Sequence, residues 1–292
     1  MSRNEQRTTA AMSPAASTNP VDAGPATEQA PVARSASLSY VTPTEFVELP
    51  SGGQYYHNEH PLRDKEVVEM RYMTARDEDI LTSPALLRKG LAVDRLLENL
   101  IVDQNIDVNE LLVGDRNAML ISARVSGYGQ DYAVELQCPA CGETVRNEFD
   151  LSKLEINHGL KPGEDSQVSL TERGTFLAEL PVTKYLVEFR LLTGRDETEL
   201  QNLADKLKKH KLPDATSTNL LKKLVVSVND VTSGAEISSF IDNMPAQDAR
   251  FLRACMQVVT PNIDMSQQTE CSSCGAVTET EVPFTSEFFW PQ

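Results

Sequence analysis

The sequence predicts an α+β fold made of two pseudo-repeated units, each containing a strand, helices and a β-hairpin that carries a cysteine knuckle. Two observations lead to this prediction. The motif Cys-x-x-Cys-Gly occurs twice, at 138–142 and at 271–275. A segment upstream of each motif also repeats, because VEMRYMTARDEDIL at 68–81 matches VEFRLLTGRDETEL at 187–200.

The elements of the first unit follow from local patterns. FVEL at 46–49 suggests a short strand before a turn-forming PSGG stretch, and the partial alternation of EVVEMRYM at 66–73 predicts a second strand. TARDED at 74–79 is typical of a helix start, with a hydroxyl at the N-cap and carboxylates in the first turns. Leucines at helical spacing predict a helix over 91–102. A third helix is expected to open after Asp115 and to end at the glycines of SGYG.

The spacing between matching residues grows along the chain, as loop insertions would make it grow. It is 119 for the strand and TxRDE residues, 124 for LLENLIV against LLKKLVV, and 133 for Asp115 against Asp248 and for the cysteine pairs. The polar stretches HKLPDATST and VNDVTSGAEI are suitable places for the insertions. The expected parts of the chain are a disordered polar tail at 1–40, an N-terminal arm with a short strand at 41–65, unit 1 at 66–158, a linker at 159–182 and unit 2 at 183–292.

The composition argues against several classes of protein. The 292 residues are 40% hydrophobic, which is enough for a core, and carry a net charge of −16. This acidity disfavours nucleic acids and anionic membranes as partners, since both bind through Lys and Arg. No apolar run reaches the length of a membrane-spanning helix, and the N-terminus lacks the apolar core of a secretory signal. We therefore expect reduced cysteines in a protein whose partners are other proteins or cations.

The two cysteine pairs predict one metal site formed by both units. Strand-like segments flank each pair, and a two-residue spacer lets both sulfurs of a knuckle reach one ion. Cys138, Cys141, Cys271 and Cys274 would supply the four thiolates of a tetrahedral site, for which zinc is the default ion. With four protein ligands no position is open for substrate, so one structural zinc would clamp the units together, with a binding free energy of roughly 10–16 kcal/mol in small zinc peptides.

Other readings of the cysteines stay open. A rubredoxin-type iron site would mean electron transfer, and a dithiol redox pair is a further option, although that motif normally begins a helix. The dithiol reading is disfavoured because the pairs lie between strands and are two in number, whereas four thiolates suit zinc or iron by geometry and zinc is taken as the default. The fifth cysteine, Cys255, lies on an apolar helical stretch and is expected to be a small buried hydrophobe.

No catalytic site can be proposed from the remaining motifs. His57 and His60 form a short acidic pair in a polar loop and lack the helical spacing of zinc-protease motifs, so we expect a solvated surface there. The carboxylates of TARDED and TGRDET are better explained as helix caps than as acid catalysts. KLKKHK at 206–211 is interpreted as the solvated end of an amphipathic helix. The sequence therefore predicts a protein that is not an enzyme.

Three stretches resemble a known family: ELPSGGQYYHNEHPL at 48–62, then 67–103, then ELLVGDRNAMLISARVSGYGQDYAVELQCPACGE at 110–143. They are similar to the baseplate hub proteins of T-even-type contractile-tailed bacteriophages, and the similarity runs from about Leu49 to Leu151. The resemblance implies a structural or assembly role in the tail baseplate and no known catalysis. It implies a virion protein, present in the host cytoplasm during assembly, whose partners are hub, tape-measure or wedge subunits. A homo-oligomer is compatible with it. The alternative is a zinc-ribbon adaptor or a rubredoxin-like electron carrier of the host cell.

Overall fold

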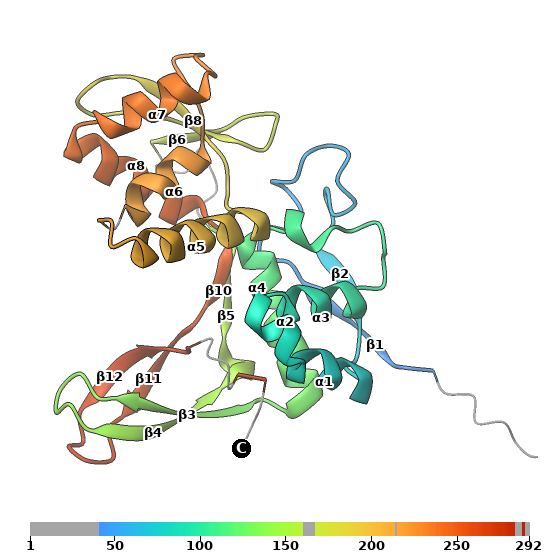
Figure 1. The fold of residues 1–292 in the computed structure, drawn as a ribbon. Helices are drawn as coiled ribbons and strands as arrows, with labels where there is room; N and C mark the ends of the chain where they lie inside the picture. Colours follow the sequence, from blue (N-terminus) through green and yellow to red (C-terminus); the bar gives the residue numbers. More distant parts are fainter. Residues whose placement is uncertain (1–40, 160–166, 214, 284–287, 290–292) are drawn as a thin grey trace, which may run out of the picture. The chain divides into compact units, whose positions relative to one another are not determined.

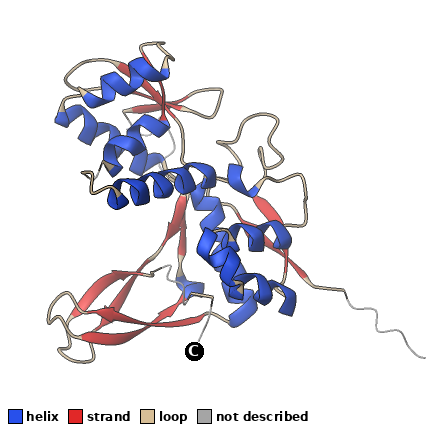
Figure 2. Ribbon diagram, viewed as in Figure 1, coloured by secondary structure: helices blue, strands red, loops and turns tan. Residues whose placement is uncertain are grey.

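A computed structural model describes residues 41–159, 167–213, 215–283 and 288–289. It combines α-helices with small antiparallel sheets, as the sequence predicts (Figures 1 and 2). The predicted tail at 1–40 lies outside the described residues. Within the described residues, no helix has both the length and the apolar character needed to cross a membrane.

The first half begins with a two-stranded sheet of β1 (Thr44–Glu48) and β2 (Val67–Arg71), followed by four helices and a hairpin. The helices are α1 (Ala75–Thr82), α2 (Pro84–Lys89), α3 (Ala92–Leu100) and α4 (Val113–Tyr128), with short 3-10 turns at Val108–Glu110 and Leu151–Lys153. The hairpin consists of β3 (Asp131–Gln137) and β4 (Thr144–Asp150), and a short strand β5 (Glu155–Asn157) follows it.

The second half begins with a four-stranded sheet in the order β6-β7-β8-β9. Its strands are β6 (Val168–Leu170), β7 (Phe176–Glu179), β8 (Leu186–Phe189) and β9 (Val225–Val228). The helices are α5 (Gly194–Lys209), α6 (Thr216–Leu224), α7 (Gly234–Asp242) and α8 (Ala246–Val259). The hairpin consists of β11 (Ser266–Glu270) and β12 (Val277–Glu281), and β10 (Asn262–Asp264) before it pairs with β5 of the first half.

Three details differ from the sequence-based expectations. The stretch 159–182, expected to be a linker, contains β6 and β7, and β7 buries Phe176 and Ala178 in the core. The third helix opens two residues before Asp115 rather than after it. The short helix α2, which starts with a proline at its first position, was not predicted.

The pair β1–β2 of the first half and the pair β7–β8 of the second half have matching registers. Val47 lies opposite Val68 in β1–β2, and Ala178 lies opposite Val187 in β7–β8. Val47 and Ala178 are 131 positions apart in the chain, whereas Val68 and Val187 are 119 apart. The loop between β7 and β8 is therefore shorter than the loop between β1 and β2. Each pair buries its inner face in the main apolar core, which both halves share.

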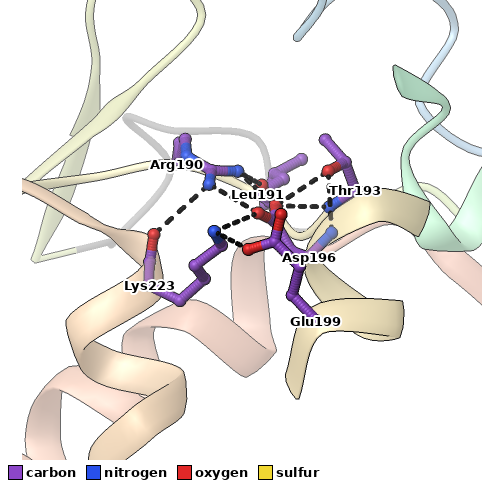
Figure 3. A network of polar contacts seen from close by, with 6 residues as sticks. All are labelled: Arg190, Leu191, Thr193, Asp196, Glu199 and Lys223. Carbon is purple, nitrogen blue, oxygen red and sulfur yellow. Dashed lines mark hydrogen bonds and ion pairs between the residues drawn. The ribbon is translucent and has the colours of Figure 1, made fainter. Parts of the chain in front are cut away.

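A matching carboxylate network starts α1 and α5. Figure 3 shows the second copy, in which Asp196 accepts hydrogen bonds from Arg190 and from the amide and hydroxyl of Thr193. Lys223, from α6, adds an ion pair to Asp196 at 3.5 Å. The equivalent residues of the first half, Arg71, Thr74 and Asp77, make the same contacts. Both are capping boxes that join a strand end to the helix that follows it.

A second buried carboxylate in each half holds the turn that follows β1 or β7. Asp115, at the start of α4, accepts bonds from the Ser51 amide and hydroxyl at 2.9 and 2.6 Å. Asp248, at the start of α8, accepts bonds from the Val182 amide at 2.8 Å and from the Thr183 hydroxyl at 2.8 Å. Each carboxylate is fully buried and ties α4 or α8 to the loop that leaves β1 or β7.

The Asp196 network predicts a pH-dependent contribution to stability. Burial alone would raise the pKa of Asp196, but the bonds from Arg190 and Thr193 outweigh it and lower that pKa to about 2. Because the pKa is lower in the folded state, the stabilisation is present above about pH 4 and is lost as the pH falls toward 2. Asp196→Asn should therefore reduce the free energy of unfolding at pH 7 by on the order of 2 kcal/mol.

Denaturant unfolding of the variant and the wild type across this pH range measures the effect. The difference in free energy should shrink from about pH 4 downward, while any acid effect on the cysteines is common to both proteins. Asp205→Asn, at an exposed position of the same helix, serves as the control and should change little. A difference that stays constant down to pH 2 would contradict the assignment of this pKa to the network.

Candidate metal centre

The two cysteine knuckles have the same backbone geometry. In the first, the Cys138 amide donates to the Glu143 carbonyl at 2.8 Å, and the Gly142 amide donates to the Cys138 carbonyl at 2.9 Å. In the second, the residues 133 positions later make the same two bonds, at 2.9 and 2.8 Å. The glycine has a φ of +77° in the first knuckle and +70° in the second, which only glycine adopts readily. Each knuckle therefore turns its two sulfurs to one side of a hairpin tip.

The knuckles bring four sulfur atoms together. The Sγ atoms of Cys138 and Cys274 are 4.0 Å apart, and those of Cys141 and Cys271 are 3.9 Å apart. All four lie within 4.8 Å of one another. A disulfide would require about 2 Å, whereas sulfurs around a tetrahedral zinc at about 2.3 Å lie about 3.8 Å from each other. The spacing therefore fits ligands of one ion, and the four predicted residues are found at one place.

The thiols strongly influence each other's protonation. Hydrogen bonds from the backbone amides of Cys141 and Ala140 lower the pKa of Cys138 to about 7. An amide bond from Glu143 favours the Cys141 thiolate, but burial and the neighbouring sulfurs outweigh it and raise that pKa to about 12. Within the cluster, Cys138 thus favours its thiolate, whereas Cys141 resists a further negative charge. A cation at the centre of the cluster would remove this resistance, because it stabilises every thiolate at once.

Few large apolar contacts hold the hairpin tips against each other. Cys138, Val145 and Cys271 form a small buried cluster of their own, separate from the main core. A hollow of about 280 Å³ lies behind the knuckles, and threonines 269, 278 and 280 contribute to its lining. At the other end of the hairpins, the Gln267 side chain accepts a bond from the Asp150 amide at 3.2 Å and donates to the Asp150 carbonyl at 2.8 Å. Small interfaces of this kind usually need a covalent or metal link.

The other candidate residues lie apart from this cluster. Cys255 is buried on α8, as expected. The expectation of a solvated histidine pair is wrong for His60, which is only 4% exposed and stacks on Tyr56 with a ring-centre distance of 4.2 Å. The residues around it in the sequence are polar and give no indication that this ring is buried. His57 lies edge-on to it and within 4.0 Å of Glu110.

Arg124, in the second half of α4, is a buried charged residue whose role the sequence does not predict. Its guanidinium donates to the carbonyls of Phe288, Gly129 and Asp131 at 2.6, 2.6 and 3.0 Å. Burial lowers its pKa. The residue thereby fastens the C-terminal Phe288 to the base of the first hairpin. No local motif signals this role, because its partners are backbone carbonyls spread along the chain.

Comparison with known proteins identifies the family. No curated protein and no solved structure matches the chain. A family model described as T4 bacteriophage base plate protein matches residues 42–290. The match includes both hairpins and both knuckles, whereas the resemblance seen in the sequence ended near Leu151. The chain therefore belongs to the T4 bacteriophage base plate protein family.

Proposed function

We propose that the protein is a structural or assembly component of the hub region of a phage tail base plate, and that one zinc ion joins its two halves. Membership of the base plate family supports the structural role. The single observation that supports the zinc site is the convergence of four sulfurs, two from each half, within 4.8 Å. The role is not catalytic: four protein ligands complete a tetrahedral zinc and leave no position for a substrate.

The two halves are, in this proposal, copies of one ancestral unit. Four observations support the duplication: the common register of β1–β2 and β7–β8, the two capping boxes, the two buried aspartates and the two knuckles. Helices α4 and α8 also begin 133 positions apart, the same spacing that separates the knuckles. A duplication explains why the four ligands come as two pairs, since each copy contributes one knuckle.

Zinc suits a structural site better than iron does. Zinc has no redox chemistry, so four thiolates around it make a closed and inert link. Iron in the same ligand set would make an electron carrier. Neither the described residues nor the family match favours that alternative or a host-cell adaptor.

The partners proposed for this protein are other base plate proteins, namely hub, tape-measure or wedge subunits. Assembly would take place in the host cytoplasm, and the protein would stay in the virion at the tail. Its net charge of −16 favours partners with complementary basic surfaces.

A phage whose copy of the gene carries Cys138→Ser should form fewer complete base plates, because the two hairpin tips would no longer be held together. Electron microscopy of the tails, compared with those of a Cys255→Ser phage, tests this role.

The metal content gives the first biochemical test. The purified chain should contain one zinc ion and show no visible absorption band. A strong chelator should remove the ion and lower the melting temperature. Elemental analysis and thermal unfolding measure both effects, and Cys255→Ser should retain one zinc. Bound iron with a visible absorption band would contradict zinc and favour a rubredoxin-like site. A protein that is stable and contains no metal would contradict the metal site itself.

The two knuckles should be equivalent in their effect on metal affinity. Cys138→Ser and Cys271→Ser should each weaken zinc binding by at least ~100-fold, because losing a ligand costs more than losing a bond that orients one. The double variant should cost little more than either single one, since both remove ligands from the same site. Competition with a chromogenic chelator measures the affinities.

Mixing the two single variants tests whether the site lies within one chain. In the intramolecular site every chain lacks one ligand, so the mixture should bind no more tightly than its components. Recovery of tight zinc binding in the mixture would show that knuckles from two chains share the ion. The protein would then be an oligomer linked by its hairpin tips.

A further inference from the structure

The outer edge of β1 carries backbone groups without a strand partner among the described residues. The Leu49 amide donates to Glu66 at 2.8 Å, and the Tyr72 amide donates to Pro43 at 2.9 Å, so odd-numbered residues bond to β2. Because bonding alternates along a strand, the N–H and C=O groups of Thr44, Phe46 and Glu48 point to the other side. The far edge of β2 is already occupied, since Met70 bridges to Ile101.

The equivalent edge in the second half is filled. There β7 pairs with β8 on one side and with β6 on the other. Leu177, which corresponds to Phe46, lies opposite Ser169 of β6. The Thr171 amide donates to the Thr175 carbonyl at 2.8 Å, two positions along from the Ser169–Leu177 pair. Because hydrogen-bonded and non-hydrogen-bonded pairs alternate, Ser169 and Leu177 are a hydrogen-bonded pair, and the backbone groups of Leu177 point toward β6. The second half thus shows what kind of segment fits this edge: an extended strand, antiparallel to the first.

The turn that joins β6 to β7 is not available at the corresponding position before β1. The turn that joins β6 to β7 contains Gly174 with a φ of +77°. Pro43 occupies the corresponding position, 131 residues earlier. A proline ring fixes φ near −65°, so the β6-type turn is not available there. Among the described residues, no strand fills the outer edge of β1 in the way that β6 fills the edge of β7.

The side chains around this edge are apolar and charged. On the exposed face, Phe46 is 70% exposed and Val67 is 44% exposed. Glu48 and Glu69 lie beside them on the same face, each opposite one of these apolar residues. Arg71, on the same face opposite Thr44, is neutralised by its ion pair with Asp77 at 2.7 Å, and His158 lies 3.9 Å from Glu48. An added strand would cover Phe46 and meet the negative charge of the two glutamates, so apolar residues flanked by Lys or Arg fit it best.

We propose that the outer edge of β1 binds an extended, basic segment of another base plate protein as an added antiparallel strand. The register of this strand follows that of β6 on β7, with an apolar segment aligned along Glu45, Phe46 and Val47. The inference rests on the duplication proposed above and does not depend on the metal. Unprotected strand edges of this type are common sites of strand addition between proteins.

Hydrogen exchange of the full-length protein tests the proposal. The probe is a peptide in which the sequence of Val168–Leu170 is flanked by two lysines on each side. At saturation it should slow exchange of the outward amides of Thr44, Phe46 and Glu48 by at least about tenfold, while the inward amides of Glu45 and Val47 stay unchanged. A glutamate-flanked version of the peptide should bind more weakly, because it would meet like charge.

Proline substitutions supply a matched pair of variants. Phe46→Pro removes an outward amide only, so it should abolish peptide binding and leave the melting temperature nearly unchanged. Leu177→Pro, at the corresponding position of β7, removes a bond to β6 and should lower the melting temperature by several degrees. If Phe46→Pro does not fold, Phe46→Lys provides the second test, since it should weaken binding of the lysine-flanked peptide without altering the backbone.

Three results would overturn the proposal. The first is that a millimolar concentration of the peptide does not slow hydrogen exchange of the outward amides of β1. The second is protection of the Phe46 amide in the free protein that disappears when residues 1–40 are deleted, which would assign the edge to the chain's own N-terminal segment. The third is protection that grows with protein concentration, which would assign it to a second copy. The zinc content of each sample, measured in parallel, separates a failure of this proposal from a failure of the metal site.

Discussion

The convergence of four cysteine sulfurs is the constraint on which the arrangement of the two hairpins depends. The atoms lie 3.9 to 4.8 Å apart, a spacing too long for disulfides and too short for four unneutralised thiolates. The hairpin tips bury only a small separate cluster, so packing contributes little to holding them in place. An ion between the knuckles would neutralise the negative charge of the sulfurs, and it would also link the two hairpins. Each hairpin would then be fixed at its tip by metal and at its base by polar contacts.

Away from the knuckles, the fold is specified by carboxylates buried at the starts of helices. Asp77 and Asp196 join a strand end to the following helix, and each has a pKa lowered by its arginine and threonine partners despite burial. The second pair, Asp115 and Asp248, differs between the two halves. Burial raises the pKa of Asp115, whereas amide and hydroxyl bonds to Asp248 outweigh burial and lower the pKa there. Asp115 and Asp248 thus hold corresponding loops, but their pKa values are shifted in opposite directions.

The sequence predicted features that depend on local patterns. Cysteine spacing predicted which sulfurs meet, and the TxRDE motif predicted two capped helices. Pairings between distant short segments were missed. β5 and β10 are three residues each, too short for a periodic signal, and they pair although more than 100 positions separate them in the chain. The sequence predicts a linker at β7 because this strand shares little more than the Glu-Leu-Pro at its end with β1. The polar neighbours of His60 predict a surface residue, whereas its ring is buried against that of Tyr56.

The most direct test of the shared site is X-ray absorption spectroscopy of the full-length protein at the zinc edge. If the two knuckles hold one ion, the spectrum should show a single shell of four sulfur atoms at about 2.3 Å. Nitrogen or oxygen atoms in that shell, or fewer than four sulfurs, would contradict the account. The halves would then not be joined by their cysteines.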